Sequence, residues 1–146
     1  MADYSVEFND TASTTLGAGQ CDADARRIEL MEWIFGSEAT AADNPFLWQI
    51  RRVTAAGSLA GTTITPAPLD TAEAVALFDA LENLTVNPSM GATLLSIPLN
   101  QRATFRWVAQ PGVPVISPAL AANGFICLTP TSSAVAITET LIIREH

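Results

Sequence analysis

The sequence contains no lysine and only one histidine, His146, which is the last of its 146 residues. Without lysine, the chain can form neither a Schiff base nor the lysine contact of a phosphate-binding loop. A histidine at the end of a chain is poorly placed to be oriented as a general base, so we expect no Ser-His-Asp or Cys-His site. Metal sites with histidine and cysteine ligands are not expected for the same reason.

Acidic residues are the remaining source of site chemistry. Asp22, Asp24 and Glu29 could place oxygen atoms around a Ca²⁺ ion, but their spacing is not that of an EF-hand loop, and acidic loops are usually solvated. A glycosidase needs two carboxylates across a cleft, and fifteen acidic residues supply many such pairs by chance. We therefore expect no catalytic, cofactor-binding or metal-binding residues and no enzymatic activity. A hydrolase with a carboxylate pair is the least favoured alternative.

Positive charge is also scarce. Seven basic residues, all of them arginine, stand against fifteen acidic residues, which gives a formal net charge of −8. Such a chain repels phosphate groups, so no nucleic-acid partner is expected. The exclusive use of arginine is explained either by codon bias in a GC-rich genome or by selection for interfaces, where arginine is favoured.

Long apolar runs are missing as well. No run approaches the roughly 20 residues of a membrane span, and the start of the sequence, Met1-Ala2-Asp3-Tyr4, is not a charged-then-apolar leader. We expect no membrane partner and a protein made in the cytoplasm. Two cysteines, Cys21 and Cys127, could pair, but they are too few for a disulfide scaffold and are expected to be free thiols.

Short stretches of alternating apolar and polar residues, separated by turns with proline and glycine, predict an all-β fold. Predicted strands lie at 4–8, 27–35, 46–54, 94–108, 113–116, 124–128 and 135–144. Because crossover helices are missing, the expected architecture is a jelly-roll-like β-sandwich rather than a parallel α/β fold. We expect residues 1–20 to form an extended N-terminal arm and residues 21–146 a single sandwich domain.

The stretch 27–35 has apolar residues in both phases of the alternation. Ile28 and Leu30 fall on one face, whereas Trp33 and Phe35 fall on the other. This pattern indicates either a strand covered on both sides or a β-bulge that shifts the alternation. The stretch 46–54 resumes a simple alternation, and the two are expected to form an antiparallel pair.

A single helix is predicted at about 71–82. Asp70 is a plausible N-cap, and Glu73 follows at the spacing of a capping box. Ala74, Leu77 and later apolar residues recur at helical intervals, as on the buried face of a helix. We expect this helix to cover an open side of the sheet.

The strongest strand signal lies at 94–108, where Ile97-Pro98-Leu99-Asn100 separates two runs. Phe105 and Trp107 alternate with Arg106 and Val108, which predicts a buried aromatic face. The following Gln110-Pro111-Gly112 is a turn signature and is expected to begin a hairpin.

Seven residues are candidates for contact with a partner chain. They are Tyr4, Val6, Phe8, Arg51, Arg52, Arg102 and Arg106. The first three alternate along the expected arm. Because Arg51 and Arg52 are adjacent in a strand, they point to opposite faces, and at least one must leave the core. Arg102 and Arg106 are expected to point toward solvent or a partner. The alternative for these arginines is local pairing with Glu29 or Glu32, which contributes little to stability when exposed.

Three tryptophans allow two interpretations. Trp33, Trp48 and Trp107 could form a platform on which sugar rings stack, as in carbohydrate-binding sandwiches. Each alternates with other apolar residues, so packing in the core or in a subunit interface is the favoured interpretation.

Several short motifs resemble those of small jelly-roll virion proteins of tailed bacteriophages. The motifs are Thr54-Ala55-Ala56-Gly57, Thr65-Pro66-Ala67-Pro68-Leu69-Asp70, Ile97-Pro98-Leu99-Asn100, Phe105-Arg106-Trp107, Val115-Ile116-Ser117-Pro118, Gly124-Phe125-Ile126 and Leu141-Ile142-Ile143-Arg144-Glu145. The resemblance covers roughly residues 26–145. It is closest in kind to capsid decoration, or cement, proteins, which form trimers on the lattice of the major capsid protein.

The resemblance implies a structural protein of the virion, assembled in the host cytoplasm. On this hypothesis the chain is a homotrimer that binds the major capsid protein, or another virion protein, and stabilises the head, without catalytic residues or cofactors. The alternative is a carbohydrate- or receptor-binding β-sandwich of a phage tail or fibre, which rests on the tryptophans.

Overall fold

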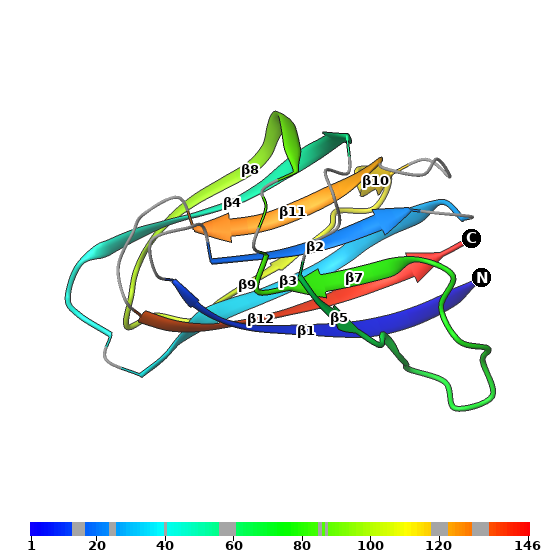
Figure 1. Ribbon diagram of the computed structural model, residues 1–146, viewed down its shortest axis with the longest axis horizontal. Helices are drawn as coiled ribbons and strands as arrows, with labels where there is room; N and C mark the ends of the chain where they lie inside the picture. Colours follow the sequence, from blue (N-terminus) through cyan, green and yellow to red (C-terminus); the bar gives the residue numbers. More distant parts are fainter. Residues whose placement is uncertain are drawn as a thin grey trace.

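Two antiparallel sheets of six strands each form a β-sandwich in the computed structural model (Figure 1). The structure describes residues 1–12, 17–23, 26–39, 41–55, 61–84, 86, 88–117, 123–129 and 135–146. None of these residues is in a helix. The predicted all-β sandwich is therefore confirmed, and its assignment to the jelly-roll type stays a prediction.

Three long strands, β1 (Ala2–Ala12), β3 (Ile28–Ala39) and β12 (Val135–Glu145), form the middle of the first sheet. Its order is β10 (Val115–Ser117), β3, β12, β1 and β6 (Ala67–Pro68). The remaining strand, β9 (Phe105–Val108), also pairs with β3. Because β12 occupies one side of β3, β9 and β10 lie one after the other along its other side.

The second sheet has the longer exposed edge. Its order is β5 (Thr62–Ile64), β7 (Asp79–Glu82), β2 (Gly17–Ala23), β11 (Asn123–Thr129), β4 (Pro45–Ala55) and β8 (Ser89–Asn100). The 12-residue strand β8 pairs only with β4 and so forms one edge of this sheet.

The first residues do not form the expected extended arm. Strand β1 lies inside the first sheet, where it pairs with β12 along its whole length and with β6. Tyr4, Val6 and Phe8 are buried in the core of their own chain. Their alternation is that of an integrated strand, so these three residues are not exposed to a partner chain. The expected boundary at residue 20 falls inside β2, a strand of the same sandwich.

Strand β3 contains the bulge that its sequence allows. Its register against β12 shifts between Ile142, which opposes Glu32, and Ile143, which opposes Leu30, so Met31 is the extra residue. The shift moves the buried positions from one phase of the alternation to the other, and both sets of apolar residues therefore face the same core.

Strands β3 and β4 do not form the expected antiparallel pair. β3 belongs to the first sheet and β4 to the second, where β4 pairs with β11 and β8. Two neighbouring amphipathic strands can meet through their side chains as well as through their backbones, and the sequence pattern does not distinguish these arrangements.

The predicted helix at 71–82 is also wrong, although its first turn forms. The backbone N–H of Ala72 donates to the Asp70 carboxylate at 2.9 Å, and the N–H of Glu73 donates to the Asp70 carbonyl oxygen at 3.0 Å. The chain then becomes extended and enters β7, which pairs with β2 and β5.

Contacts with β1 and β12 explain why the helix does not continue. The hydroxyl of Tyr4 donates to the carbonyl oxygen of Ala74 at 2.9 Å, and the N–H of Leu77 donates to both carboxylate oxygens of Glu145 at 3.3 and 3.2 Å. Phe78 then enters the core against the ring of Tyr4. Tertiary contacts thus take the backbone groups that a helix would use internally.

Aromatic side chains join the two sheets in the core. The ring of Phe35 on β3 lies 4.1 Å from that of Trp33 and 4.6 Å from that of Trp48 on β4, measured between centroids. Rings of this size bury about 150–250 Å² each, so this stack is a large part of the apolar contact between the sheets. The core interpretation is confirmed for Trp33 and Trp48, which are fully buried.

Candidate functional site

The sandwich is open where β8 of the second sheet faces β9 and β10 of the first. A hollow of about 440 Å³ lies at this opening, and we call it the edge groove. Its walls are Leu94 and Leu95 of β8, Trp107 and Val108 of β9, and the segment 113–115. The polar groups on the walls are Arg52 and Gln110, and no lining residue is acidic.

One wall of the edge groove is formed where the chain between β9 and β10 leaves β3. The N–H of Ala109 still donates to the Met31 carbonyl oxygen at 2.9 Å, but the chain then leaves β3 and returns only where Val115 opposes Leu30. Between these points the N–H of Val113 donates to Gln110 at 3.0 Å.

The turn signature in this segment is confirmed, whereas the hairpin is not. Gly112 has a φ of 83°, which fits the third position of a type II turn with Pro111 before it. The expected hairpin fails because β9 and β10 both pair with β3 and run in the same direction along it.

Large apolar side chains are exposed around the edge groove. Val108 is 52% exposed and Val113 is 68% exposed. Trp107 is half-buried against the core, but Phe105 remains 39% exposed. The aromatic face predicted for 94–108 is thus only partly buried, because it lies on an edge strand that the second sheet does not fully cover.

The adjacent arginines of β4 both make bonds within the chain. The guanidinium of Arg52 crosses to the first sheet, where it donates to the carbonyl oxygen of Ile116 and, at 3.3 Å, to the hydroxyl of Ser117. Arg51 donates to the Gly91 carbonyl oxygen of β8 at 3.0 Å. Both arginines are half-buried, so their contacts hold β4 to β8 and β10 beside the edge groove.

The other two candidate arginines point away from the core, as expected. Arg106 forms an ion pair with Glu32 on the adjacent strand, and this bond lowers the pKa of Glu32 against the opposing effect of burial. Local pairing, the alternative considered for this residue, is therefore confirmed. Arg102 lies in the turn before β9, is exposed, and donates to the Ala41 carbonyl oxygen at 3.4 Å.

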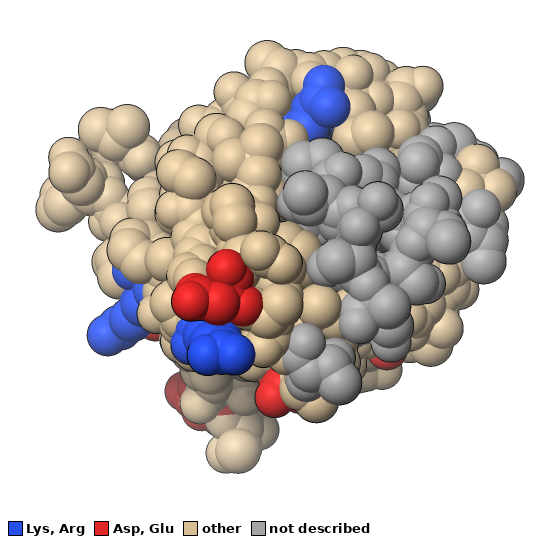
Figure 2. All heavy atoms as spheres, turned by 90° about the vertical axis from the view of Figure 1, so that its left-hand side faces the viewer, with Lys and Arg blue, Asp and Glu red and all other residues tan. Residues whose placement is uncertain are grey.

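The end of the molecule opposite the termini carries few charged groups where the structure describes it. Figure 2 views the sandwich from this end, and most of the described surface is uncharged, with acidic and basic groups side by side in one area. The termini lie together at the other end in Figure 1.

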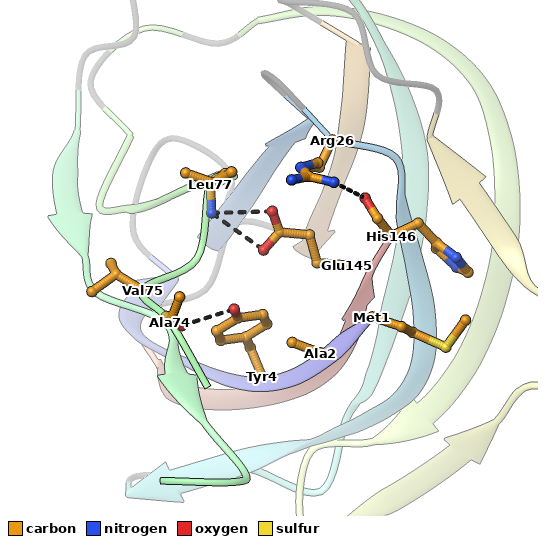
Figure 3. Close-up of a pocket in the computed structure, with 9 residues that line it drawn as sticks. All are labelled: Met1, Ala2, Tyr4, Arg26, Ala74, Val75, Leu77, Glu145 and His146. Atoms are coloured by element: carbon orange, nitrogen blue, oxygen red, sulfur yellow. Dashed lines mark hydrogen bonds between the residues drawn. The ribbon is translucent and has the colours of Figure 1, made fainter. Parts of the chain in front are cut away.

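A second hollow, of about 190 Å³, lies at the end with the termini, and we call it the terminal pocket (Figure 3). Its walls come from the start of β1, the end of β12, Arg26 and the segment that replaces the predicted helix. The carboxylate of Glu145 and the ring of Tyr4 face into it, and Val75 and Leu77 form its outer wall.

Carboxylates near the terminal pocket act on the hydroxyl of Tyr4. The pKa of Tyr4 is raised, first by burial and then by the negative charges of Glu145 and Glu73. The ion pairs of the described residues join Arg27 to Glu29, Arg106 to Glu32 and Arg144 to Asp3, and His146 Nε2 lies 3.2 Å from Glu29. None of these contacts includes Glu145.

A third hollow, of about 310 Å³, adjoins the terminal pocket and is lined by Asp3 and Arg144. These residues oppose each other in β1 and β12 and share two hydrogen bonds, at 2.8 and 3.0 Å. The bonds lower the pKa of Asp3, against the opposing effect of burial. The charges of Asp3 and Arg144 therefore neutralise each other on the wall of this hollow.

The terminal pocket was not predicted because its residues lie at opposite ends of the sequence. One signal was present: Glu139 and Glu145 fall in phase with Leu141 and Ile143 on the buried face of β12. A carboxylate in a buried phase needs a hydrogen-bonding partner, and such a position is a candidate for function.

Several kinds of site are absent from the described residues. In the ranges that the structure describes, no helix has the length and apolar character needed to cross a bilayer. Within the same ranges, no three side chains of histidine, cysteine, aspartate or glutamate gather as metal ligands do. The three tryptophans do not form a platform, since only Trp107 reaches the surface. The candidate Ca²⁺ ligands Asp22 and Asp24 lie outside the residues with described side chains.

Comparisons of the chain with protein-family models, curated proteins and solved structures find no match.

Proposed function

We propose that the protein is a structural component of a bacteriophage virion, a decoration protein that forms a homotrimer, binds the major capsid protein lattice and stabilises the head. The role requires no catalytic group or cofactor, and its place of action is the virion assembled in the host cytoplasm. The observation that carries the proposal is the exposed apolar surface of the edge groove.

Exposed apolar side chains favour contact with another protein. Val108 and Val113 line the groove together with the half-buried Trp107 and the leucines of β8, so the apolar residues of the groove lie together rather than scattered. Burial of such surface stabilises a complex by about 25 cal/mol per Å² before the costs of association. A neighbouring subunit that covers the groove would therefore gain affinity from residues the chain leaves exposed.

Charge also favours this surface for contact between subunits. The chain carries a net charge of −8, so two copies repel each other in most orientations. The edge groove has no acidic residue among its lining residues, and the 12-residue strand β8 contains no charged residue at all. Copies can meet there without bringing carboxylates together.

The capsid-binding part of the proposal is tested with purified expanded shells of a tailed-phage major capsid protein. The purified protein is expected to co-sediment with expanded shells and to raise the temperature at which they open. Failure to bind expanded shells, with the protein folded and present in excess, would reject the decoration role.

A second candidate function is recognition of a carbohydrate or receptor by a phage tail or fibre. It is supported by Trp107, whose ring lies in the edge groove near Arg52 and Gln110, because sugars bind to an aromatic ring flanked by polar groups. Host glycans are then expected to quench tryptophan fluorescence in the wild type and not in Trp107→Phe. Equal quenching in both proteins, or none in either, would reject this function.

A further inference from the structure

We propose that the terminal pocket binds a primary ammonium group, carried by a lysine side chain of another protein or by a small alkyl amine. The inference concerns a different surface from the edge groove. It stands or falls independently of the proposed function, because its test uses a small amine and no capsid.

The Glu145 carboxylate is buried and has no cationic partner among the described residues. Glu145 is 6% exposed, the N–H of Leu77 donates to its carboxylate oxygens at 3.3 and 3.2 Å, and the Tyr4 hydroxyl makes a weaker bond to it. All arginines, the single histidine and the N-terminus lie in the described residues, and none of them forms an ion pair with Glu145. A carboxylate removed from water gains most from a cation that enters beside it.

The hydroxyl of Tyr4 can also bond to an ammonium group. The hydroxyl hydrogen of Tyr4 is used in the bond to Ala74, which leaves the lone pairs of its oxygen able to accept. An ammonium group has three donors and no acceptor, so it can bond to the Glu145 carboxylate and to this oxygen together. Figure 3 shows both groups on the pocket wall.

The pocket has room for the ligand and an apolar entrance. A volume of about 190 Å³ admits a compact ammonium on an aliphatic stem. The entrance is apolar, since Val75 is 73% exposed and Leu77 and Met1 are also exposed. Methylene groups of a lysine stem can lie against these side chains while the charge is inside.

Met1 also lines the pocket, but its terminal ammonium forms no ion pair with Glu145, so we expect the ligand to come from another molecule. The chain contains no lysine, and the one cationic side chain on the pocket wall, Arg26, donates instead to the carbonyl oxygen of His146 at 3.4 Å. Arg26 is a like charge near the proposed ammonium and is expected to oppose its binding. A site for an anion would reverse this expectation, because Arg26 would then hold the ligand.

The test is titration of the folded protein with n-butylamine at neutral pH, followed by backbone amide NMR. The amides of Leu77 and Ala74 are expected to shift together along one saturable curve. Glu145→Gln is expected to weaken binding about tenfold or more, since a charge-assisted hydrogen bond is lost. Tyr4→Phe is expected to weaken it by a smaller factor, and Arg26→Gln to strengthen it.

Glu7→Gln is the matched control, because it removes one negative charge from an exposed position of β1 away from the pocket. It is expected to leave the affinity within about twofold of the wild type, as for any distant exposed charge. The proposal is overturned if the Leu77 amide of the wild type does not respond to the amine, or if Glu7→Gln and Glu145→Gln weaken binding equally. It is also overturned if Arg26→Gln weakens binding. The wild-type measurement decides the matter even if Glu145→Gln does not fold.

The source of the ammonium is resolved by a second probe. Nα-acetyl-lysine methylamide carries the same group within a peptide frame. Tighter binding of this probe than of n-butylamine favours a lysine of a partner protein, and the reverse order favours a free amine. Equal binding of the corresponding arginine derivative would contradict the preference for a primary ammonium.

Discussion

Trp33 and Glu139 are joined by a hydrogen bond inside the core, from the indole Nε1 to a carboxylate oxygen at 2.9 Å. Glu139 is 1% exposed, so its carboxylate depends on donors within the protein. Trp48 is equally buried, yet its Nε1 has no hydrogen-bond partner among the described residues. The two indoles therefore separate the effect of the hydrogen bond from that of the ring.

Trp33→Phe is expected to lower the free energy of unfolding by about 1–3 kcal/mol more than Trp48→Phe. Both changes remove similar volume from the core, but only the first deprives a buried carboxylate of a donor. Chemical denaturation of the two variants measures the difference. Equal losses of stability would show that the Trp33 bond contributes nothing beyond packing.

Arg52 is expected to stabilise the junction between the sheets. Arg52→Met keeps an aliphatic stem but leaves the Ile116 carbonyl oxygen without this donor, and it should lower the free energy of unfolding by about 1–3 kcal/mol. Arg102→Met is the control, because Arg102 is exposed and makes one long bond, and it should change stability by less than about 0.5 kcal/mol. A similar effect of both changes would contradict the role given to Arg52.

Gly61 and Gly112 differ in why glycine is needed. A Cβ atom on Gly61 would lie 2.7 Å from the Glu82 carbonyl oxygen, whereas at Gly112 the space is open and the φ of 83° is the constraint. Gly112→Ala should therefore cost about 1 kcal/mol, and Gly61→Ala about 1–3 kcal/mol because backbone must move. Thermal unfolding of both variants tests this order, and a larger loss at Gly112 would contradict it.

The ion pair of Asp3 and Arg144 gives stability that depends on pH. The pKa of Asp3 is lowered in the folded protein from its ordinary value of 3.8, so the contribution is present above that value and is lost as the pH falls through the folded pKa. Since both side chains are about one-third exposed, the contribution is small, roughly 0.2–1 kcal/mol. Asp3→Asn should be less stable than wild type at pH 7 and equal to it at about pH 2. A difference that persists at low pH would mean that the substitution acts through something other than the ion pair.

The strands could be predicted from the sequence because alternation is a local property. A strand with apolar residues in both phases is either covered on both sides or contains a bulge. The structure shows the bulge in β3, because Trp33 and Phe35 are buried in the same core as Leu30. The exposed direction of Arg106 followed from the same alternation.

Other features depend on contacts that the local pattern does not encode. Asp70 and Glu73 give a correct turn, but the next residues bond to Tyr4 and Glu145 instead of to each other. The arm expected at the start of the chain is a strand of the first sheet, because its partner β12 lies at the other end of the sequence. The terminal pocket forms between segments distant in sequence and could not be located before the sheet order was known. The edge groove is lined mostly by residues 94–115, but these belong to different sheets, which the local pattern does not show.

Copies of the chain are proposed to meet at the edge groove. Multi-angle light scattering of the purified protein is predicted to give three times the 15.4 kDa mass of the chain, and Val113→Asp is predicted to give a monomer. Val75→Asp is the matched control, because Val75 is as exposed as Val113 but lies at the other hollow, and it should remain a trimer. A wild-type monomer, or a Val113→Asp variant that keeps the trimer mass, would contradict the account.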